Sequence, residues 1–62
     1  QHKLSIAGDI IFDTAVAYDL QGKKIDLRVE QITIDVSGLR DRIYILKLDS
    51  DTTTYTFKFI KN

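Results

Sequence analysis

Residues 42–49 read Arg-Ile-Tyr-Ile-Leu-Lys-Leu-Asp, and this stretch decides the fold class. Apolar side chains stand at every second position, with Tyr44, Leu46 and Leu48 on one predicted face. A period of two indicates a β-strand, because successive side chains of a strand point to opposite faces of a sheet. The other face carries isoleucines, so we expect both faces to be partly buried, with Tyr44 and Leu46 in the core.

A second alternating stretch follows at residues 54–61, after a turn of small polar residues at 50–53. Tyr55, Phe57 and Phe59 share one face of this stretch, opposite threonines and lysines. Two such stretches separated by a short polar turn predict an antiparallel hairpin. Because one face of each strand must be buried for a sheet to be stable, we expect Phe57 to be a core residue.

Upstream segments show the same period over shorter lengths. The expected strand segments are Leu4–Ile6, Ala15–Leu20, Lys23–Leu27 and Gln31–Asp35, with a compact apolar run at Ile10–Phe12 and residues 28–30 left unassigned. Gln21 and Gly22 predict a hairpin turn, because glycine adopts a positive φ without steric cost. Residues 36–41 interrupt the alternation of apolar and polar side chains. They predict a corner whose leucine, Leu39, packs into the core.

Threonine, valine and isoleucine make up 18 of the 62 residues, and no window shows the apolar spacing of an amphipathic helix. Six or seven short strands with turns about every 8–12 residues are typical of a sandwich or a small barrel. The predicted fold class is all-β, as a small immunoglobulin-like antiparallel β-sandwich. We expect residues 1–62 to form a single domain, because a chain this short buries only about 60% of its unfolded surface.

Charge and cysteine content exclude several function classes. Nine lysines and arginines balance nine acidic residues, so no overall field favours nucleic acid or an anionic membrane. The absence of cysteine removes disulfides and the commonest soft-metal ligand. No apolar run approaches the roughly 20 residues of a membrane span. We therefore expect neither a nucleic-acid partner nor direct membrane insertion.

Residues suited to catalysis are scarce. His2 is the only histidine and stands at the extreme end of the chain, where chains fray. Ser37 lies in the predicted corner, but a nucleophilic serine needs an adjacent base that a third group orients. We expect Ser37 to form the turn, and we expect no enzyme and no catalytic residue.

Two further patterns allow binding chemistry. Asp49 and Asp51 offer hard oxygen ligands for calcium, although aspartates also bond their own backbone in turns and the wider ligand set is missing. The six tyrosines and phenylalanines could form a stacking platform for sugars or single-stranded nucleic acid, but their alternation with threonine and lysine favours the core. We expect no metal site and no cofactor.

Four sequence blocks follow one another along most of the chain: Tyr18–Lys24, Ile34–Leu39, Ile43–Leu48 and Thr54–Asn62. They read Tyr-Asp-Leu-Gln-Gly-Lys-Lys, Ile-Asp-Val-Ser-Gly-Leu, Ile-Tyr-Ile-Leu-Lys-Leu, and a last strand ending in Lys-Phe-Ile-Lys-Asn. With these blocks in order, about three quarters of the chain resembles the C-terminal sorting domain of proteins exported by the bacterial type IX secretion system.

Two features depart from the pattern of that family. Arg42 stands where the family usually has glycine, and the chain contains no proline, although an Asn-Pro dipeptide normally begins the pattern. Either the sequence starts just after that dipeptide or the chain is a divergent member. A missing first strand would leave a sheet edge unpaired, and unpaired edges attract another chain, so a strand-swapped homodimer is a further expectation.

The resemblance implies a folded export tag that performs no chemistry. The tag would be the C-terminal domain of a longer secreted protein and would pass through the periplasm with its cargo. Its implied partners are the outer-membrane translocon and a sortase-like peptidase, which would cut before Gln1. The implied destination is the cell surface or the medium.

The last strand and chain end, at Lys58, Lys61 and Asn62, form the expected recognition surface, with the Gly38 and Leu39 corner second. We expect replacement of Lys61 to leave folding intact. The alternative function is an accessory β-sandwich of a secreted glycoside hydrolase, which would bind carbohydrate or act as a spacer. A carbohydrate-binding module should carry an exposed aromatic strip.

Overall fold

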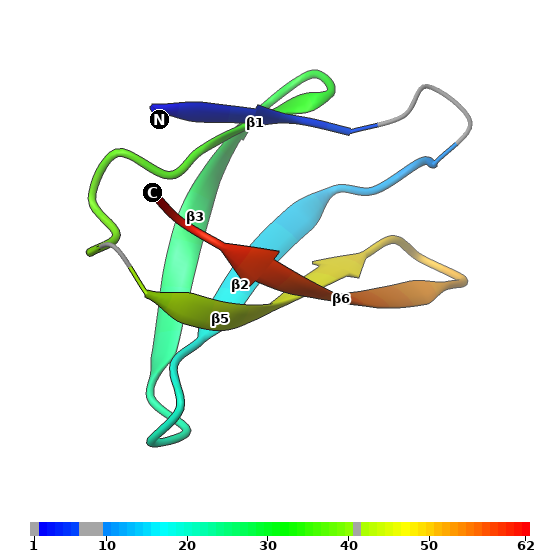
Figure 1. The fold of residues 1–62 in the computed structure, drawn as a ribbon. Helices are drawn as coiled ribbons and strands as arrows, with labels where there is room; N and C mark the ends of the chain where they lie inside the picture. Colours follow the sequence, from blue (N-terminus) through cyan, green and yellow to red (C-terminus); the bar gives the residue numbers. More distant parts are fainter. Residues whose placement is uncertain (1, 7–9, 41) are drawn as a thin grey trace.

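The computed structural model describes residues 2–6, 10–40 and 42–62. These residues form strands joined by turns and loops, and they contain no helix. The strands are β1 (Lys3–Ser5), β2 (Thr14–Tyr18), β3 (Lys24–Glu30), β4 (Thr33–Asp35), β5 (Ile43–Asp49) and β6 (Thr54–Ile60) (Figure 1). The predicted all-β fold class is confirmed.

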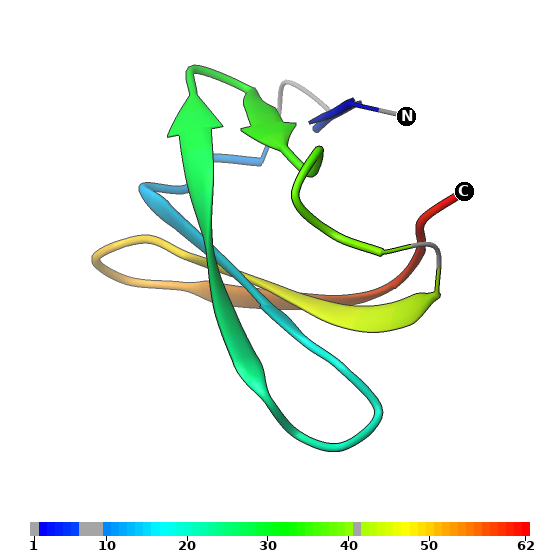
Figure 2. The same cartoon turned by 90° about the vertical axis from the view of Figure 1, so that its left-hand side faces the viewer.

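The strands of the described chain form one antiparallel sheet in the order β1-β4-β3-β2-β5-β6. β3 pairs with two neighbours at different points, since residues 24–27 face β2 and residues 28–30 face β4. The sheet curls along β3, and Figure 2 shows β1 and β4 lying over the layer of β2, β5 and β6. The two layers of the predicted sandwich are therefore two halves of one curled sheet.

β3 serves both layers because its side chains alternate strictly between inside and outside. Ile25, Leu27 and Val29 are half-buried against the core, and the residues between them are charged and exposed. Residues 28–30, which the sequence pattern left unassigned, continue this alternation. The chain reverses only at Gln31, whose φ of 57° is left-handed.

The turn between β2 and β3 is organised by one carboxylate. Asp19 Oδ1 accepts hydrogen bonds from the backbone N–H groups of Gln21 and Lys23, each at 2.9 Å. Gly22 takes a φ of 83°, which an L side chain rarely adopts, and its N–H donates to the Asp19 carbonyl at 3.0 Å. The predicted glycine turn is confirmed, and Asp19 holds it closed.

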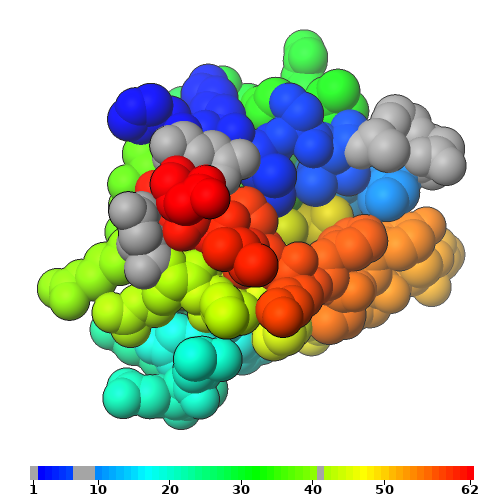
Figure 3. Space-filling model, viewed as in Figure 1, coloured from blue at the N-terminus to red at the C-terminus, as the bar shows by residue number. Residues whose placement is uncertain are grey.

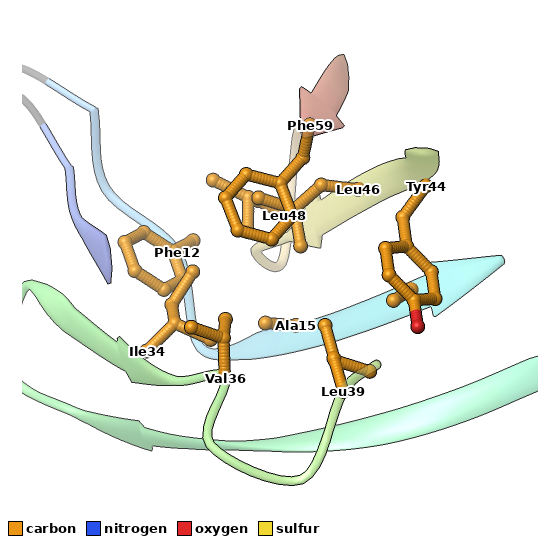
Figure 4. Close-up of a cluster of buried hydrophobic side chains, with 10 residues drawn as sticks. Phe12, Ala15, Ile34, Val36, Leu39, Tyr44, Leu46, Leu48 and Phe59 are labelled. Atoms are coloured by element: carbon orange, nitrogen blue, oxygen red, sulfur yellow. The ribbon is translucent and has the colours of Figure 1, made fainter. Parts of the chain in front are cut away.

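The core lies between the two layers of the curled sheet (Figure 4). Its buried side chains are Phe12, Ala15, Ala17, Ile34, Val36, Leu39, Tyr44, Leu46, Leu48 and Phe59. Tyr44 and Leu46 are 2% and 1% exposed, as their positions in the alternating stretch predict. The predicted corner is also confirmed through Arg40, because the Leu39 N–H donates to the Val36 carbonyl at 3.0 Å and the Leu39 side chain is buried.

The prediction that Phe57 is a core residue is wrong, because this residue is 38% exposed. β6 stands at the end of the sheet order, so Phe57 has a neighbouring strand on one side only, where it lies opposite Leu46. Its ring stacks on that of Tyr55, with the centroids 6.4 Å apart and the planes at 10°. The aromatic face of β6 points inward, but only Phe59 on it is fully buried.

We predict that the two core-facing positions on this hairpin differ in their contribution to stability. Leu46→Ala should lower the free energy of unfolding by about 2–5 kcal/mol, because it opens a cavity in a closed part of the core. Phe57→Ala should cost clearly less, because part of its ring is already in water. Urea denaturation followed by circular dichroism measures both, and equal losses would contradict the open position of Phe57.

Candidate recognition surface at the chain end

Ser37 is part of a local turn. Its hydroxyl donates to Asp35 Oδ1 at 2.6 Å, and its backbone N–H donates to the same oxygen at 2.9 Å. These two bonds, the hydroxyl bond first, hold the pKa of the Asp35 carboxyl below its usual value. Neither of these two bonds supplies a histidine-like base for the Ser37 hydroxyl. Both of them close the corner after β4.

Asp49, one of the two carboxylates considered as calcium ligands, is engaged within its own hairpin. Thr54 Oγ1 donates to Asp49 Oδ1 at 2.5 Å, and Lys47 Nζ lies 3.9 Å from Asp49 Oδ2. Within residues 2–6, 10–40 and 42–62, no three histidine, cysteine, aspartate or glutamate side chains gather as a metal site. Asp49 therefore ties the start of β6 to the end of β5.

The aromatic residues do not form an exposed strip suited to polysaccharide. Tyr44 is buried, and its hydroxyl donates to the Arg40 carbonyl at 3.1 Å. Phe12 and Phe59 are enclosed in the core, Tyr55 is partly buried against it, and Phe57 lines an open groove. The carbohydrate-binding alternative therefore finds no support in the positions of these rings.

Lys61 is the buried charged side chain of the described chain, at 7% exposure. Its backbone N–H donates to the Arg42 carbonyl at 3.0 Å, so the pairing of β5 with β6 continues past Ile60. Its ammonium donates to the Leu39 carbonyl at 3.2 Å. Lys61 was expected on the recognition surface, but its aliphatic stem is enclosed, and its charge meets a backbone oxygen of the corner.

This contact joins the two segments that the sequence proposed separately for recognition. The Leu39 carbonyl of the corner contacts the Lys61 ammonium of the chain end, while Lys58 lies on the exposed side of β6. Figure 3 shows the chain end in red, seated between the N-terminal strand and the corner. A Cβ added at Gly38 would meet no atom within 4 Å, so the surface there is open.

A polar cleft of about 380 Å³ opens on the other side of the corner. The β2–β3 turn and β3 form one wall, with Asp19, Gln21, Lys23 and Ile25, and the corner and the start of β5 form the other, with Gly38, Leu39, Arg40, Arg42 and Tyr44. Sequence reasoning missed this site, because its cations come from two segments far apart in the chain. The departure from the family at Arg42 was the one signal available.

An apolar groove of about 230 Å³ opens between the two ends of the curled sheet. β1 and the segment after it contribute Leu4, Ser5, Ile6 and Ile10, and β5 and β6 contribute Leu46, Phe57, Lys58 and Phe59. β1 and β6 are the edge strands of the described sheet. The groove is therefore the open seam of the sandwich.

Comparison with known families decides what this domain is. The family model described as "Secretion system C-terminal sorting domain" matches residues 3–62, which is nearly the whole chain. The chain belongs to the C-terminal sorting domains of the type IX secretion system. No curated protein and no solved structure matches the chain.

Membership in this family gives the sorting domain its general role. Domains of the family are sorting signals rather than catalytic units, and the type IX secretion machinery recognises them. The cargo of such a domain is a secreted or cell-surface protein. In the described part of the sorting domain, no helix is long and apolar enough to cross a membrane.

The buried position of Lys61 reverses the expectation for its replacement. Lys61→Ala should lower the free energy of unfolding by about 1–3 kcal/mol, because it empties an enclosed space and removes the donor to the Leu39 carbonyl. Lys58→Ala is the matched control and should change it by no more than about 0.5 kcal/mol, because Lys58 is exposed. Equal urea midpoints for the two variants would contradict the enclosed contact.

We predict that the domain loses stability in acid because of the carboxylates of Asp19 and Asp35, which lie in two turns. The Lys23 N–H in one turn and the Ser37 hydroxyl in the other lower the pKa of Asp19 and Asp35 below 3.8, the value of the free side chain. Their ionised forms therefore stabilise the fold above about pH 3.8, and this stabilisation is lost as the pH falls through the folded pKa.

Urea denaturation at a series of pH values checks this. The double variant Asp19→Asn/Asp35→Asn should lose less stability between neutral and acidic pH than the wild type does. Asp26→Asn, on the exposed side of β3, is the control and should keep the wild-type dependence. An unchanged acid dependence in the double variant would contradict the role assigned to the turns.

Proposed function

We propose that residues 1–62 are the C-terminal domain of a longer secreted protein and act as its folded export signal. In this proposal the domain crosses the inner membrane with its cargo, folds in the periplasm and is then recognised by the outer-membrane translocon. A sortase-like peptidase at the cell surface cuts before the domain and releases the cargo. The family match over residues 3–62 is the observation that supports this function most strongly.

The recognition surface that we propose is the joined corner and chain end. Gly38 and Asn62 offer exposed groups to the translocon, and Lys58 extends the surface along β6. Leu39 and Lys61 are positioning residues, because the bond between them fixes the corner against the chain end. A surface that is rigid before contact loses less conformational entropy on binding than a flexible peptide does.

We also propose that a second copy can use the open seam. The groove between β1 and β6 is lined by Leu4, Ile6 and Phe57, and it runs beside the free edge of β6. A strand exchanged from another copy could pair with that edge and cover these side chains, which would give a strand-swapped homodimer. Light scattering of the purified domain measures its mass, and Phe57→Lys should reduce any dimer fraction.

Fusion of residues 1–62 to a periplasmic reporter in a type IX secreting strain tests the export signal. We expect the reporter to reach the cell surface or the medium. A Lys58→Glu variant should keep its unfolding midpoint and lose at least about half of the export, because the Lys58 side chain is exposed. Lys24→Glu/Asp26→Asn, on the far strand β3, is the control and should export normally.

Retention of the wild-type reporter in the periplasm, with the domain folded, would overturn the export function. Normal export of the Lys58→Glu variant would leave the export function intact and overturn the assigned recognition surface.

A further inference from the structure

We propose that the cleft between the β2–β3 turn and the corner binds an acidic segment of a partner polypeptide, in which carboxylates stand next to apolar side chains. The cleft holds the cations of Lys23, Arg40 and Arg42 on facing walls. The inference rests on the proposed function in one respect only, which is that the partner belongs to the export machinery. The ligand chemistry of the cleft follows from its own residues.

The three cations of the cleft are available for a ligand. All three residues are exposed, and none forms an ion pair with a carboxylate of the described residues. The ion pairs of the described chain lie elsewhere, on β3 with β1 and on β5. Asp41, between the two arginines in sequence, is outside the described residues.

The carboxylate in the cleft wall does not neutralise these cations by direct contact. Asp19 directs Oδ1 at the N–H groups of Gln21 and Lys23, and these bonds close its own turn. No nitrogen of Arg40 or Arg42 is paired with it, in the part of the chain that the structure describes. Among the described residues of the cleft, three cations thus face one carboxylate, which leaves an excess of positive charge.

The positive charge of the cleft lies at one end of the domain, and acidic residues lie at the other, although the net charge of the chain is zero. Arg42 precedes β5, and Asp49 ends it, so the two stand about 20 Å apart along a seven-residue strand. Asp13 and Asp51 line a different hollow at that far end, beside Ser50 and Thr53. An acidic ligand would therefore be drawn to the cleft end of the domain and repelled from the other.

The lining of the cleft favours a polypeptide over a compact anion. Ile25 is half-buried and contributes apolar surface beside the cations, and the buried side chains of Leu39 and Tyr44 lie beneath it. The Tyr44 hydroxyl donates to the Arg40 carbonyl, which fixes the backbone that carries that guanidinium. A phosphate would leave the Ile25 side chain unused and would approach Asp19, whereas a peptide can place carboxylates on the arginines and an apolar group against Ile25.

A fluorescein-labelled peptide of alternating glutamate and leucine, titrated with the whole 62-residue domain, tests the cleft. We expect saturable binding at low salt that weakens as ionic strength rises, and no binding of the same peptide with glutamine for glutamate. Arg40→Gln/Arg42→Gln should weaken binding at least about tenfold. Lys24→Gln/Arg28→Gln changes the net charge equally on β3 and should bind as the wild type does.

Absence of binding, or an equal loss in both double variants, would overturn the cleft as a site. Inorganic phosphate at millimolar concentration should not displace the peptide, and displacement would overturn the choice of a polypeptide ligand. The reporter fusion provides the link to export. If Arg40→Gln/Arg42→Gln abolishes peptide binding but exports normally while the wild type exports, the partner is not part of the machinery, and the export function itself still stands.

Discussion

The structure depends on one shared strand. β3 gives residues 24–27 to the pairing with β2 and residues 28–30 to the pairing with β4, so a single seven-residue element belongs to both layers. Its inward side chains, Ile25, Leu27 and Val29, pack against the core from the bend of the sheet. In a chain without disulfides, this continuity of the sheet and the burial between its halves hold the layers together.

Two hydrogen bonds of Lys61 fix the chain end. Lys61 adds one more backbone pair to the β5–β6 ladder and sends its ammonium to the Leu39 carbonyl. Leu39 in turn is a core residue, so the corner is anchored from below by apolar burial and from the side by a charged donor. A surface at the end of the chain, where fraying is the usual expectation, thereby becomes part of the folded unit.

Alternation in the sequence predicts which way a side chain points but not how deep it lies. Tyr44 and Leu46 are buried as predicted because β5 has a strand on each side. Phe57 has the same inward direction but stands on an edge strand, and the order of strands is not readable from the period alone. Residues 28–30 were left unassigned as ambiguous, although each occupies a proper strand position.

The candidate site was less accessible to sequence reasoning than the fold was. The corner and the last strand were both singled out, but their contact was not, because a lysine near a chain end is normally expected in water. The cleft was missed because Lys23 and the two arginines converge only when β2 pairs with both β3 and β5. The Lys61–Leu39 contact and the cleft both depend on pairings between strands that are distant in the chain, and a single sequence does not reveal these pairings.

The attachment of β1 has a mechanical consequence. In the sheet of the described residues this strand is three residues long and pairs with β4 only, while the β5–β6 hairpin is paired over seven positions. A pull from the N-terminal side would peel β1 away one residue at a time before it loaded the hairpin. Tension applied from the N-terminal side would thus separate β1 from β4 first, and the β5–β6 hairpin at the other end of the sheet would keep its shape.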